Sequence, residues 1–495
     1  MAATKDFLAF DLGAESGRGI LGRFDGTKIT LEVVHRFPNT PVRLNGTLHW
    51  DTPRQFGELL TALSLCARDH SRELAGIGVD TWGVDFGLLG ADGALVGLPV
   101  HYRDSRTDGM LDKAFGIVGR ERISERTGIQ FMQLNTLYQL LAMKTVGAPQ
   151  LQVAKKLLFT PDLFNYWFTG RQVSEVSIAS TSQFWDPRAG AWATDLLDAL
   201  DLPTDLLPEV VPPGTVVGEL LADLAAEAGV GRLPVISPGS HDTASAVAAV
   251  PAVGSDHAYI SSGTWSLMGI ESKVPLINEQ TLALNFTNEG GVCDTIRFLK
   301  NIMGLWLVQQ TRRAYERAGQ SYDYATLTQM AAEAPAFAVV IDPDDSRFLN
   351  PSSMTEAIAD YCQATGQAVP EGPGGMVRAC LEGLALKYRW VTEKLESIRG
   401  AAIGSINMVG GGTQNTLLCQ ISADCCGRPV VAGPIEATAT GNLLMQALAV
   451  GEIGSLDQLR EVVRASFDLI TYEPNPATRG AWDAAYAKFT GLLGQ

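Results

Sequence analysis

A carboxylate at the expected start of a helix is the most informative candidate for chemistry in this sequence. Asp242 follows Gly239 and His241 in the segment GSHDTASAV, and the small apolar residues after it predict a helix. A carboxylate in this place is either the N-cap of that helix or a general base that accepts a proton from a bound ligand. The segment alone leaves both interpretations open.

Three glycine-containing segments have the composition of nucleotide-binding turns. DLGAESGR (11–18) follows an apolar run, and SSGTWSLMG (261–269) offers hydroxyl and N–H groups. The glycines of MVGGGTQN (408–415) leave room for a flat base or a ribose. Ordinary tight turns would explain each segment taken alone. The chain has no Gly-Lys dipeptide and its glycine spacing at 13, 17 and 19 is not G-x-G-x-x-G, so neither a P-loop nor a Rossmann fingerprint is present.

Carboxylates beside an indole indicate a sugar site. VDTWGVDF (79–86) places Asp80, Trp82 and Asp85 at the end of an expected strand, where carboxylates can accept from hydroxyl groups. YRDSRT (102–107) adds Asp104 and Arg106. The competing interpretations are an exposed loop and a solvated charge cluster, which contributes little.

The composition argues against several classes of function. The chain has 495 residues, with 38 Lys and Arg against 54 Asp and Glu, for a formal net charge of −16. Such acidity, without a basic patch, predicts that neither nucleic acid nor an anionic membrane is a partner. A phosphorylated ligand would then have to be held by local backbone N–H groups, a metal ion or a few cations.

Cysteine and histidine usage points to a reduced compartment and no zinc site. The seven cysteines are an odd number without a CxxC pair, and the six histidines lack metal-ligand spacing. The first apolar run is too short for a signal peptide, and no run of 18 apolar residues occurs. We therefore expect a cytoplasmic protein.

Alternating strands and helices predict α/β architecture. Expected strands cover 7–11, 28–36 and 76–82. Residues 17–26 are expected to form a strand that turns at Asp25-Gly26, 405–412 a strand that runs into three glycines, and 258–269 a strand–turn–strand. Expected helices cover 53–70, 108–124, 135–146, 161–168, 301–318, 354–365, 376–398 and 415–427. Gly13 and Gly263 lie in similar expected hairpins, one in each half of the chain. This suggests two similar domains, 1–250 and 251–495, with a nucleotide bound between them. The alternative is that the two hairpins are unrelated.

These segments, in this order, resemble the FGGY family of carbohydrate kinases. The matching stretches run from residue 7 to about 442, and they include DLGAESGR, GIGVDTWGVDFGLL, GSHDTASAV, YISSGTWSLMG, LKNIMGLW, MVGGGTQN and GPIEATATGN. The resemblance implies two similar domains of the actin/hexokinase/Hsp70-like (ribonuclease H-like) ATPase fold with a deep interdomain cleft. It also implies transfer of phosphate from Mg-ATP to a small-molecule sugar.

The resemblance assigns roles residue by residue. Asp242 matches the base that accepts the proton of the sugar hydroxyl, and Asp11 matches the residue that holds Mg²⁺. The sugar-side positions are Gly83, His241, Asp242, Thr243 and Asn301, to which we add Trp82, Asp80, Asp85, Asp104 and Arg106. The ATP-side positions are Ala14, Glu15, Ser16, Gly17, Arg18, Thr264, Gln309 and Gly411. The carboxylate of Glu15 should repel phosphate, so we expect no direct phosphate contact from it.

Two alternatives remain at this stage. The acceptor could be one of several ketoses or polyols, because sugar specificity rests on few contacts. The fold would also suit an actin-like nucleotide-binding protein without a small-molecule acceptor. The sequence leaves open whether the protein is a monomer or a homodimer.

Overall fold

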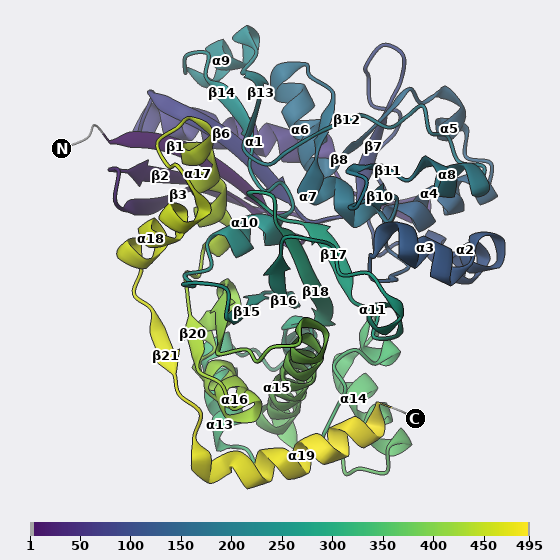
Figure 1. Cartoon of the computed structure of the whole chain (residues 1–495), viewed down its shortest axis with the longest axis vertical. Coiled ribbons are helices and arrows are strands. Elements are labelled where there is room, and N and C mark those ends of the chain that lie inside the picture. The colour runs from purple at the N-terminus through teal and green to yellow at the C-terminus, as the bar shows by residue number, and fades with distance from the viewer. Residues whose placement is uncertain (1–3, 494–495) are drawn as a thin grey trace. The chain divides into compact units, whose positions relative to one another are not determined.

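A computed structural model of the chain describes residues 4–493, which form two compact units (Figure 1). The first unit comprises Met1–Ala249, Glu271–Leu299 and Ala437–Ser466. The second comprises Val250–Ile270, Lys300–Glu436 and Phe467–Gln495. Two segments from the second half of the sequence thus belong to the first unit. The division into domains 1–250 and 251–495 stays a prediction.

The first unit is built on a six-stranded sheet. Its order is β13 (Thr215–Glu219), β14 (Pro234–Ser237), β6 (Leu74–Thr81), β1 (Lys5–Leu12), β2 (Ser16–Phe24) and β3 (Ile29–Pro38). β1 and β2 form an antiparallel hairpin, whereas β6 runs parallel to β1. The apolar run of β1 is buried from Phe7 to Leu12, as expected for a central strand covered on both faces.

The second unit repeats this arrangement. Its strands have the order β18 (Ile296–Met303), β16 (Trp265–Ser272), β15 (His257–Ser262), β19 (Ser405–Val409), β20 (Val430–Ala432) and β21 (Ile470–Tyr472). β15 and β16 form an antiparallel hairpin and β19 runs parallel to β15. β18 begins in the first unit, where it pairs with β17 (Thr287–Gly290). A glycine-tipped hairpin with a parallel third strand therefore occurs once in each unit.

Both units are rich in helices. Those of the first unit are α1 (Thr52–Asp69), α2 (Met110–Val118), α3 (Arg120–Thr127), α4 (Thr136–Thr145), α5 (Pro149–Val153), α6 (Thr160–Thr169), α7 (Val176–Ala179), α8 (Thr194–Ala199), α9 (Ala222–Ala228), α10 (Asp242–Ala248), α11 (Glu279–Ala283), α17 (Ala437–Ala449) and α18 (Leu456–Ser466). Those of the second are α12 (Trp306–Arg317), α13 (Tyr324–Glu333), α14 (Met354–Ala364), α15 (Gly372–Arg399), α16 (Thr416–Cys426) and α19 (Arg479–Leu492). No helix within residues 4–493 is both long and apolar enough to cross a membrane.

Short strands complete the first unit. They are β4 (Val42–Leu44), β5 (Thr47–His49), β7 (Phe86–Leu89), β8 (Lys156–Phe159), β9 (Val173–Glu175), β10 (Trp185–Asp186), β11 (Ala191–Trp192) and β12 (Glu209–Val211). Leu8 and Phe10 of β1 and Leu59 of α1 belong to one buried apolar cluster. On α1, Asp51 is the N-cap, and its side chain accepts from the Arg54 N–H at 3.4 Å.

Two helix predictions were wrong in detail. The expected helix 108–124 is two helices, because Gly119 adopts a φ of 90° between them. The expected helix 301–318 starts at Trp306, since residues up to Met303 belong to β18. Gly304 separates the two elements, and a Cβ there would lie 2.5 Å from the carbonyl carbon of Trp265.

Candidate active site

Asp242 is the first residue of α10, and His241 takes the N-cap position. Oδ1 of Asp242 accepts from the Thr243 N–H at 2.5 Å and from the Thr243 hydroxyl at 3.0 Å. Nε2 of His241 lies 3.4 Å from the same oxygen. Within residues 4–493 all protein contacts of this carboxylate fall on Oδ1, and the side chain is 31% exposed. One oxygen is therefore fixed, while Oδ2 is available to a ligand.

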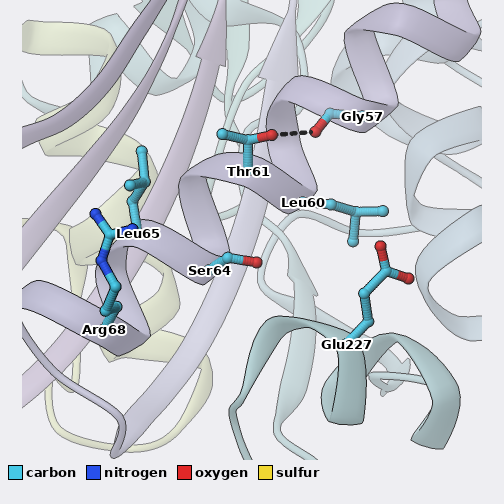
Figure 2. Close-up of a pocket in the computed structure, with 7 residues that line it drawn as sticks. All are labelled: Gly57, Leu60, Thr61, Ser64, Leu65, Arg68 and Glu227. Carbon is cyan, nitrogen blue, oxygen red and sulfur yellow. Dashed lines mark hydrogen bonds between the residues drawn. The ribbon is translucent and has the colours of Figure 1, made fainter.

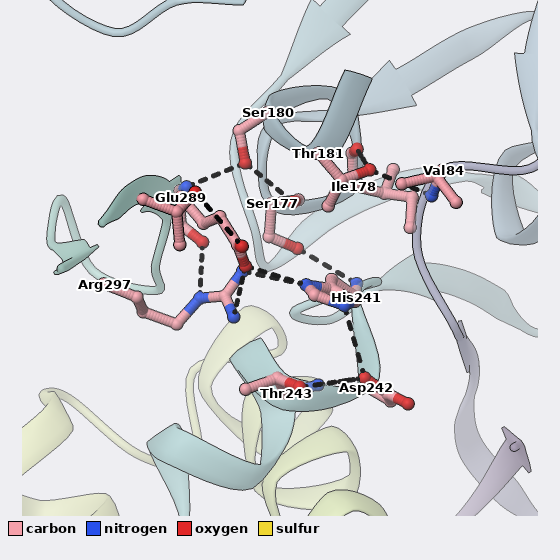
Figure 3. A network of polar contacts seen from close by, with 12 residues as sticks. Val84, Ser177, Ile178, Ser180, Thr181, His241, Asp242, Thr243, Glu289 and Arg297 are labelled. Carbon is pink, nitrogen blue, oxygen red and sulfur yellow. Dashed lines mark hydrogen bonds and ion pairs between the residues drawn. The ribbon is translucent and has the colours of Figure 1, made fainter. Parts of the chain in front are cut away.

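A buried ion pair between Arg297 and Glu289 contacts His241 (Figure 3). Nη2 of Arg297, on β18, lies 3.0 Å from His241 Nδ1, and Nη1 lies 3.2 Å from Glu289 Oε2. Arg297 is fully buried and Glu289, on β17, is 4% exposed. A buried charge needs such a partner, because its desolvation is otherwise costly.

A second acid holds the loop before α10. Glu175 accepts from the N–H groups of Ser177 at 2.7 Å and Ser240 at 2.9 Å, and from the Ser177 hydroxyl. The Ser177 hydroxyl oxygen in turn accepts from the His241 N–H at 3.1 Å. Burial raises the pKa of Glu175, and these hydrogen bonds act against that shift. The backbone on which His241 and Asp242 lie is thereby fixed to β9.

Gly83, His241, Asp242 and Thr243 are brought together. A Cβ on Gly83 would lie 3.3 Å from His241 Nε2 and 3.1 Å from Thr181 Cγ2, so a side chain there would crowd the histidine. Because the Thr243 hydroxyl donates to Asp242, it helps to orient that carboxylate.

Asp11 and Asp80 lie opposite each other on the parallel strands β1 and β6. Asp11 is 2% exposed and accepts from Arg18 Nη2 at 2.9 Å. Asp80 is fully buried, and its Oδ2 accepts from Asn442 Nδ2 of α17 at 2.6 Å. Burial and the negative charge of Asp11 raise the pKa of Asp80 well above its usual value. The structure thus places Asp80 beside the candidate magnesium residue.

Trp82, Asp85 and Arg106 belong to a separate buried cluster. Oδ2 of Asp85 accepts from the indoles of Trp50 at 2.5 Å and Trp82 at 3.0 Å, and Oδ1 accepts from Gln139 at 3.0 Å. Burial raises the pKa of Asp85 to about 6. Gln139 also accepts from Arg106 at 2.6 Å.

Asp104 also has protein donors. Its Oδ2 accepts from the Leu48 N–H at 2.8 Å and its Oδ1 from the Arg106 N–H at 3.0 Å. Asp104 is 8% exposed, so the segment 102–107 is not a solvated charge cluster.

The hairpin between β1 and β2 is closed by a 3.0 Å bond from the Gly13 N–H to the Ser16 carbonyl. A Cβ on Gly17 would lie 2.2 Å from the ring of Phe37, so this glycine makes room for the protein's own phenylalanine. Ala14 and Ser16 are partly exposed and Glu15 is exposed. The hairpin thus presents its tip rather than Gly17 to a ligand.

In the second unit, Thr264 and Gln309 lie together. Nε2 of Gln309 is 3.3 Å from the Thr264 hydroxyl, and the Trp306 N–H donates to the Thr264 carbonyl at 3.0 Å. These contacts fix α12 to the hairpin at Gly263. Asn301, the other sugar-side candidate of this unit, lies on β18.

The three glycines after β19 differ in their surroundings. A Cβ on Gly412 would lie 2.0 Å from Ser262 Oγ, and Gly410 adopts a φ of 89°. A Cβ on Gly411 would meet nothing within 4 Å. Only Gly411 therefore has open space for a ligand beside it.

A hollow of about 340 Å³ lies elsewhere on the first unit (Figure 2). It is lined by α1 and Glu227 of α9, and it contains none of the predicted site residues. Arg68, one of its lining residues, pairs with the neighbouring Asp69 at 2.6 Å. We assign it no role.

Several residues of the site were not predicted. They are Trp50, Gln139, Glu175, Ser177, Glu289, Arg297 and Asn442. The sequence signal that could have found two of them is a charged residue among apolar or small residues: Arg297 stands in an apolar run, and Glu289 stands within TNEGG. Buried charges of this kind require partners.

Comparisons with known proteins show the family to which the chain is related. Residues 7–249 match the N-terminal domain, and 258–450 the C-terminal domain, of the FGGY family of carbohydrate kinases. A rhamnulokinase from Bacteroides thetaiotaomicron is 43% identical over 489 residues, covering 99% of both chains. One from Pectobacterium atrosepticum is 44% identical over 475 residues, covering 95% of this chain and 94% of the relative.

Solved structures show the same fold at low identity. Gluconate kinase from Lactobacillus acidophilus superposes with a TM-score of 0.81 at 17% identity, covering 99% of this chain and 98% of that one. Plasmodium falciparum glycerol kinase with ADP gives a TM-score of 0.78 at 15% identity and covers 99% of both. The fold is therefore the two-domain, actin/hexokinase-like kinase fold.

The fold and the family matches together define an enzyme that transfers phosphate to a carbohydrate. The chain belongs to the FGGY family of carbohydrate kinases. Kinases of this family use ATP and a small-molecule sugar. The alternative of an actin-like protein without a sugar acceptor has no support from these matches.

Proposed function

We propose that this carbohydrate kinase transfers the γ-phosphoryl group of ATP to O1 of L-rhamnulose and releases L-rhamnulose 1-phosphate and ADP. Relatives named rhamnulokinase, 43% and 44% identical over nearly the whole chain, support this acceptor. The observation that carries the mechanism is the carboxylate of Asp242, fixed at Oδ1 and available at Oδ2.

Asp242 acts as the general base in this proposal. Oδ2 accepts the proton of the O1 hydroxyl as O1 attacks the γ-phosphorus, and the bond from phosphorus to the leaving ADP oxygen breaks. His241, Gly83 and Thr243 adjoin Asp242 and belong to the sugar side, together with Asn301. The buried cluster that supports the sugar side consists of Trp82, Asp85, Asp104 and Arg106. Its carboxylates already accept from protein donors, so we do not assign them as acceptors for sugar hydroxyls.

The nucleotide is assigned to the two hairpins and the glycine turn. The tip of the Ala14–Arg18 hairpin offers backbone N–H groups to phosphate, as does the hairpin that carries Thr264. Gln309 orients Thr264, and Gly411 leaves space for the adenosine. The exposed Glu15 contributes its backbone only, because its carboxylate would repel phosphate.

The residues present fit a magnesium ion at Asp11. Mg²⁺ prefers oxygen ligands and is usually held by one or two carboxylates, waters and phosphate oxygens. Asp11 supplies a buried carboxylate, and Oδ1 of the adjacent Asp80 is buried without a partner among the described residues. Within residues 4–493 no group of three or more His, Cys, Asp or Glu could hold a metal. When bound, Mg²⁺ would neutralise charge on the phosphates.

Replacing the base tests this proposal. Asp242→Asn keeps the shape and can still accept at Oδ1, but it cannot take a proton. We expect kcat with L-rhamnulose and Mg-ATP to fall about 100- to 10,000-fold, the usual contribution of a general base. ADP release is measured alongside ATP binding by calorimetry, which should be unchanged. Full turnover in this variant would remove Asp242 from the role.

A further inference from the structure

The imidazole of His241 lies between two groups of opposite charge (Figure 3). Nε2 is 3.4 Å from Oδ1 of Asp242, and Nδ1 is 3.0 Å from Nη2 of Arg297. A neutral imidazole carries one proton, on one nitrogen or the other. The choice decides whether His241 offers Asp242 a hydrogen-bond donor or a lone pair.

Arg297 determines this choice because it can only donate. A guanidinium has five N–H donors, no acceptor, and remains charged in proteins. Arg297 is fully buried, and its other nitrogens are engaged by the Gly290 carbonyl at 2.8 Å and by Glu289 at 3.2 Å. A proton on His241 Nδ1 would face an arginine N–H at 3.0 Å. Nδ1 therefore keeps its lone pair, and the proton is on Nε2.

Glu289 competes for the same nitrogen. Its Oε2 lies 3.4 Å from His241 Nδ1 and would accept a proton placed there. Arg297 is nearer to Nδ1, at 3.0 Å, and it pairs with the same Oε2 at 3.2 Å. The arginine thus faces both groups, as a donor toward Nδ1 and as the cation beside the Glu289 carboxylate, so the proton on Nε2 suits both contacts. On the other side of the ring, Asp242 Oδ1 faces Nε2 at 3.4 Å and favours a donor on that nitrogen.

We propose that Arg297 is a positioning residue for the kinase reaction. It holds His241 in the form protonated on Nε2, whose N–H donates to Oδ1 of Asp242 and leaves Oδ2 to the sugar hydroxyl. This inference rests on the proposed role of Asp242 as the base. Without Arg297, Glu289 would draw the proton to Nδ1, and a lone pair on Nε2 would face the carboxylate.

The tautomer can be observed directly in the wild-type protein. Histidine is labelled with ¹⁵N, His241 is assigned by its absence in His241→Gln, and two-bond ¹H–¹⁵N spectra distinguish the two nitrogens. We expect Nδ1 without a proton and Nε2 with one. A protonated Nδ1 overturns the inference. This readout needs no turnover, so it can fail or succeed independently of the Asp242→Asn experiment.

Variants then connect the tautomer to turnover. Arg297→Met removes every donor of this side chain. We expect kcat to fall about 10- to 100-fold, the loss seen when the hydrogen-bond partner behind a metal-ligating histidine is removed, with the proton moved to Nδ1. Arg297→Lys retains a donor and should restore most of kcat and the Nε2–H form. Arg378→Gln, which breaks a buried pair with Glu382 in the second unit, should change neither.

The results that contradict the proposal are equally specific. Arg297→Met with unchanged kcat and tautomer would overturn it. The proposal would also be overturned if Arg297→Lys were as slow as Arg297→Met but kept the wild-type tautomer. Arg297 would then affect kcat only through the stability of the fold. If Arg297→Met does not fold, the wild-type spectrum and the lysine variant still decide.

Discussion

Asp85 shows how one buried carboxylate can organise several aromatic side chains. It accepts from Trp50, Trp82 and Gln139, and from the Tyr102 N–H at 3.2 Å. Four donors on two oxygens suit a carboxylate, whereas an amide would turn a donor toward one of them. Asp85 is therefore expected to be a structural centre of the sugar side.

The pH dependence of stability tests this role. The pKa of Asp85 is raised to about 6, from about 3.9 in an unfolded chain, so the folded protein holds the extra proton between about pH 4 and 6. This group therefore lowers the free energy of unfolding as pH rises through that window, by up to about 1.4 kcal/mol per pH unit. In urea titrations, the free energy of unfolding should therefore fall less for Asp85→Asn than for the wild type as the pH is raised from 4.5 to 6.5.

The exposed Asp92 provides a matched control for that comparison. Asp92→Asn removes a charge without removing a buried acceptor, so its unfolding free energy should follow the wild type across the same pH range. Identical pH slopes for the wild type and Asp85→Asn would show that Asp85 does not titrate as described.

At this scale, sequence reasoning singled out Asp242 and His241 but not the buried residues that contact them. Asp242 and His241 stand in one short segment with a recognisable composition. Arg297 lies 56 residues from His241, and only folding brings them together. The contact joins β18 to the residue before α10, two elements that are distant in the sequence.

At the scale of elements, the three glycines of the turn after β19 differ in what surrounds them. The sequence predicts that all three glycines leave room for adenosine. The structure distinguishes them, because Gly412 packs against the buried Ser262 and Gly411 has no neighbour within 4 Å. Sequence alone could not make this distinction, since the partner strand β15 is far away in the chain.

Paired alanine variants test the distinction. Gly412→Ala should lower the free energy of unfolding by about 1–3 kcal/mol, the usual cost of overpacking, because its Cβ would lie 2.0 Å from Ser262 Oγ. Gly411→Ala should stay within about 0.5 kcal/mol of the wild type and instead raise the KM for ATP. Denaturant unfolding and steady-state kinetics measure both. Equal destabilisation by the two variants would refute this assignment.

The hairpin strands β1, β2, β15 and β16, their parallel neighbours β6 and β19, and helices such as α16 follow from apolar patterning and from caps such as Gly427, which adopts a φ of 62°. The failures occurred at Gly119 and Gly304. A glycine inside a helical pattern is an ambiguous signal, because its effect depends on contacts such as that of Gly304 with Trp265.

At the scale of the whole molecule, the first unit depends on a distant part of the chain. α17 packs against β1, β6 and α10. Its Asn442 donates to the buried Asp80 at 2.6 Å, and Gln446 donates to the Leu8 carbonyl at 3.1 Å. Gly441 lies so close to α10 that a Cβ would be 1.8 Å from the Ser245 carbonyl oxygen.

A fragment of residues 1–250 should therefore not fold by itself. It lacks α17, so it would expose apolar surface of β1 and β6 to water and lose the hydrogen bonds that Asn442 and Gln446 donate to this sheet. Circular dichroism during urea unfolding should show no cooperative transition for the fragment, unlike the full chain. A cooperative transition in the fragment would show that 1–250 is an autonomous domain.

The central claim is that the protein phosphorylates L-rhamnulose at O1. The most direct measurement is ADP release from Mg-ATP with L-rhamnulose, L-fuculose, xylulose, gluconate and glycerol, followed by NMR of the product. We predict a kcat/KM for L-rhamnulose at least about 100-fold above the others, as expected where several hydroxyl contacts discriminate, and ³¹P–¹³C coupling at C1. Equal or faster turnover of another sugar, or phosphate on another oxygen, would contradict the proposed function.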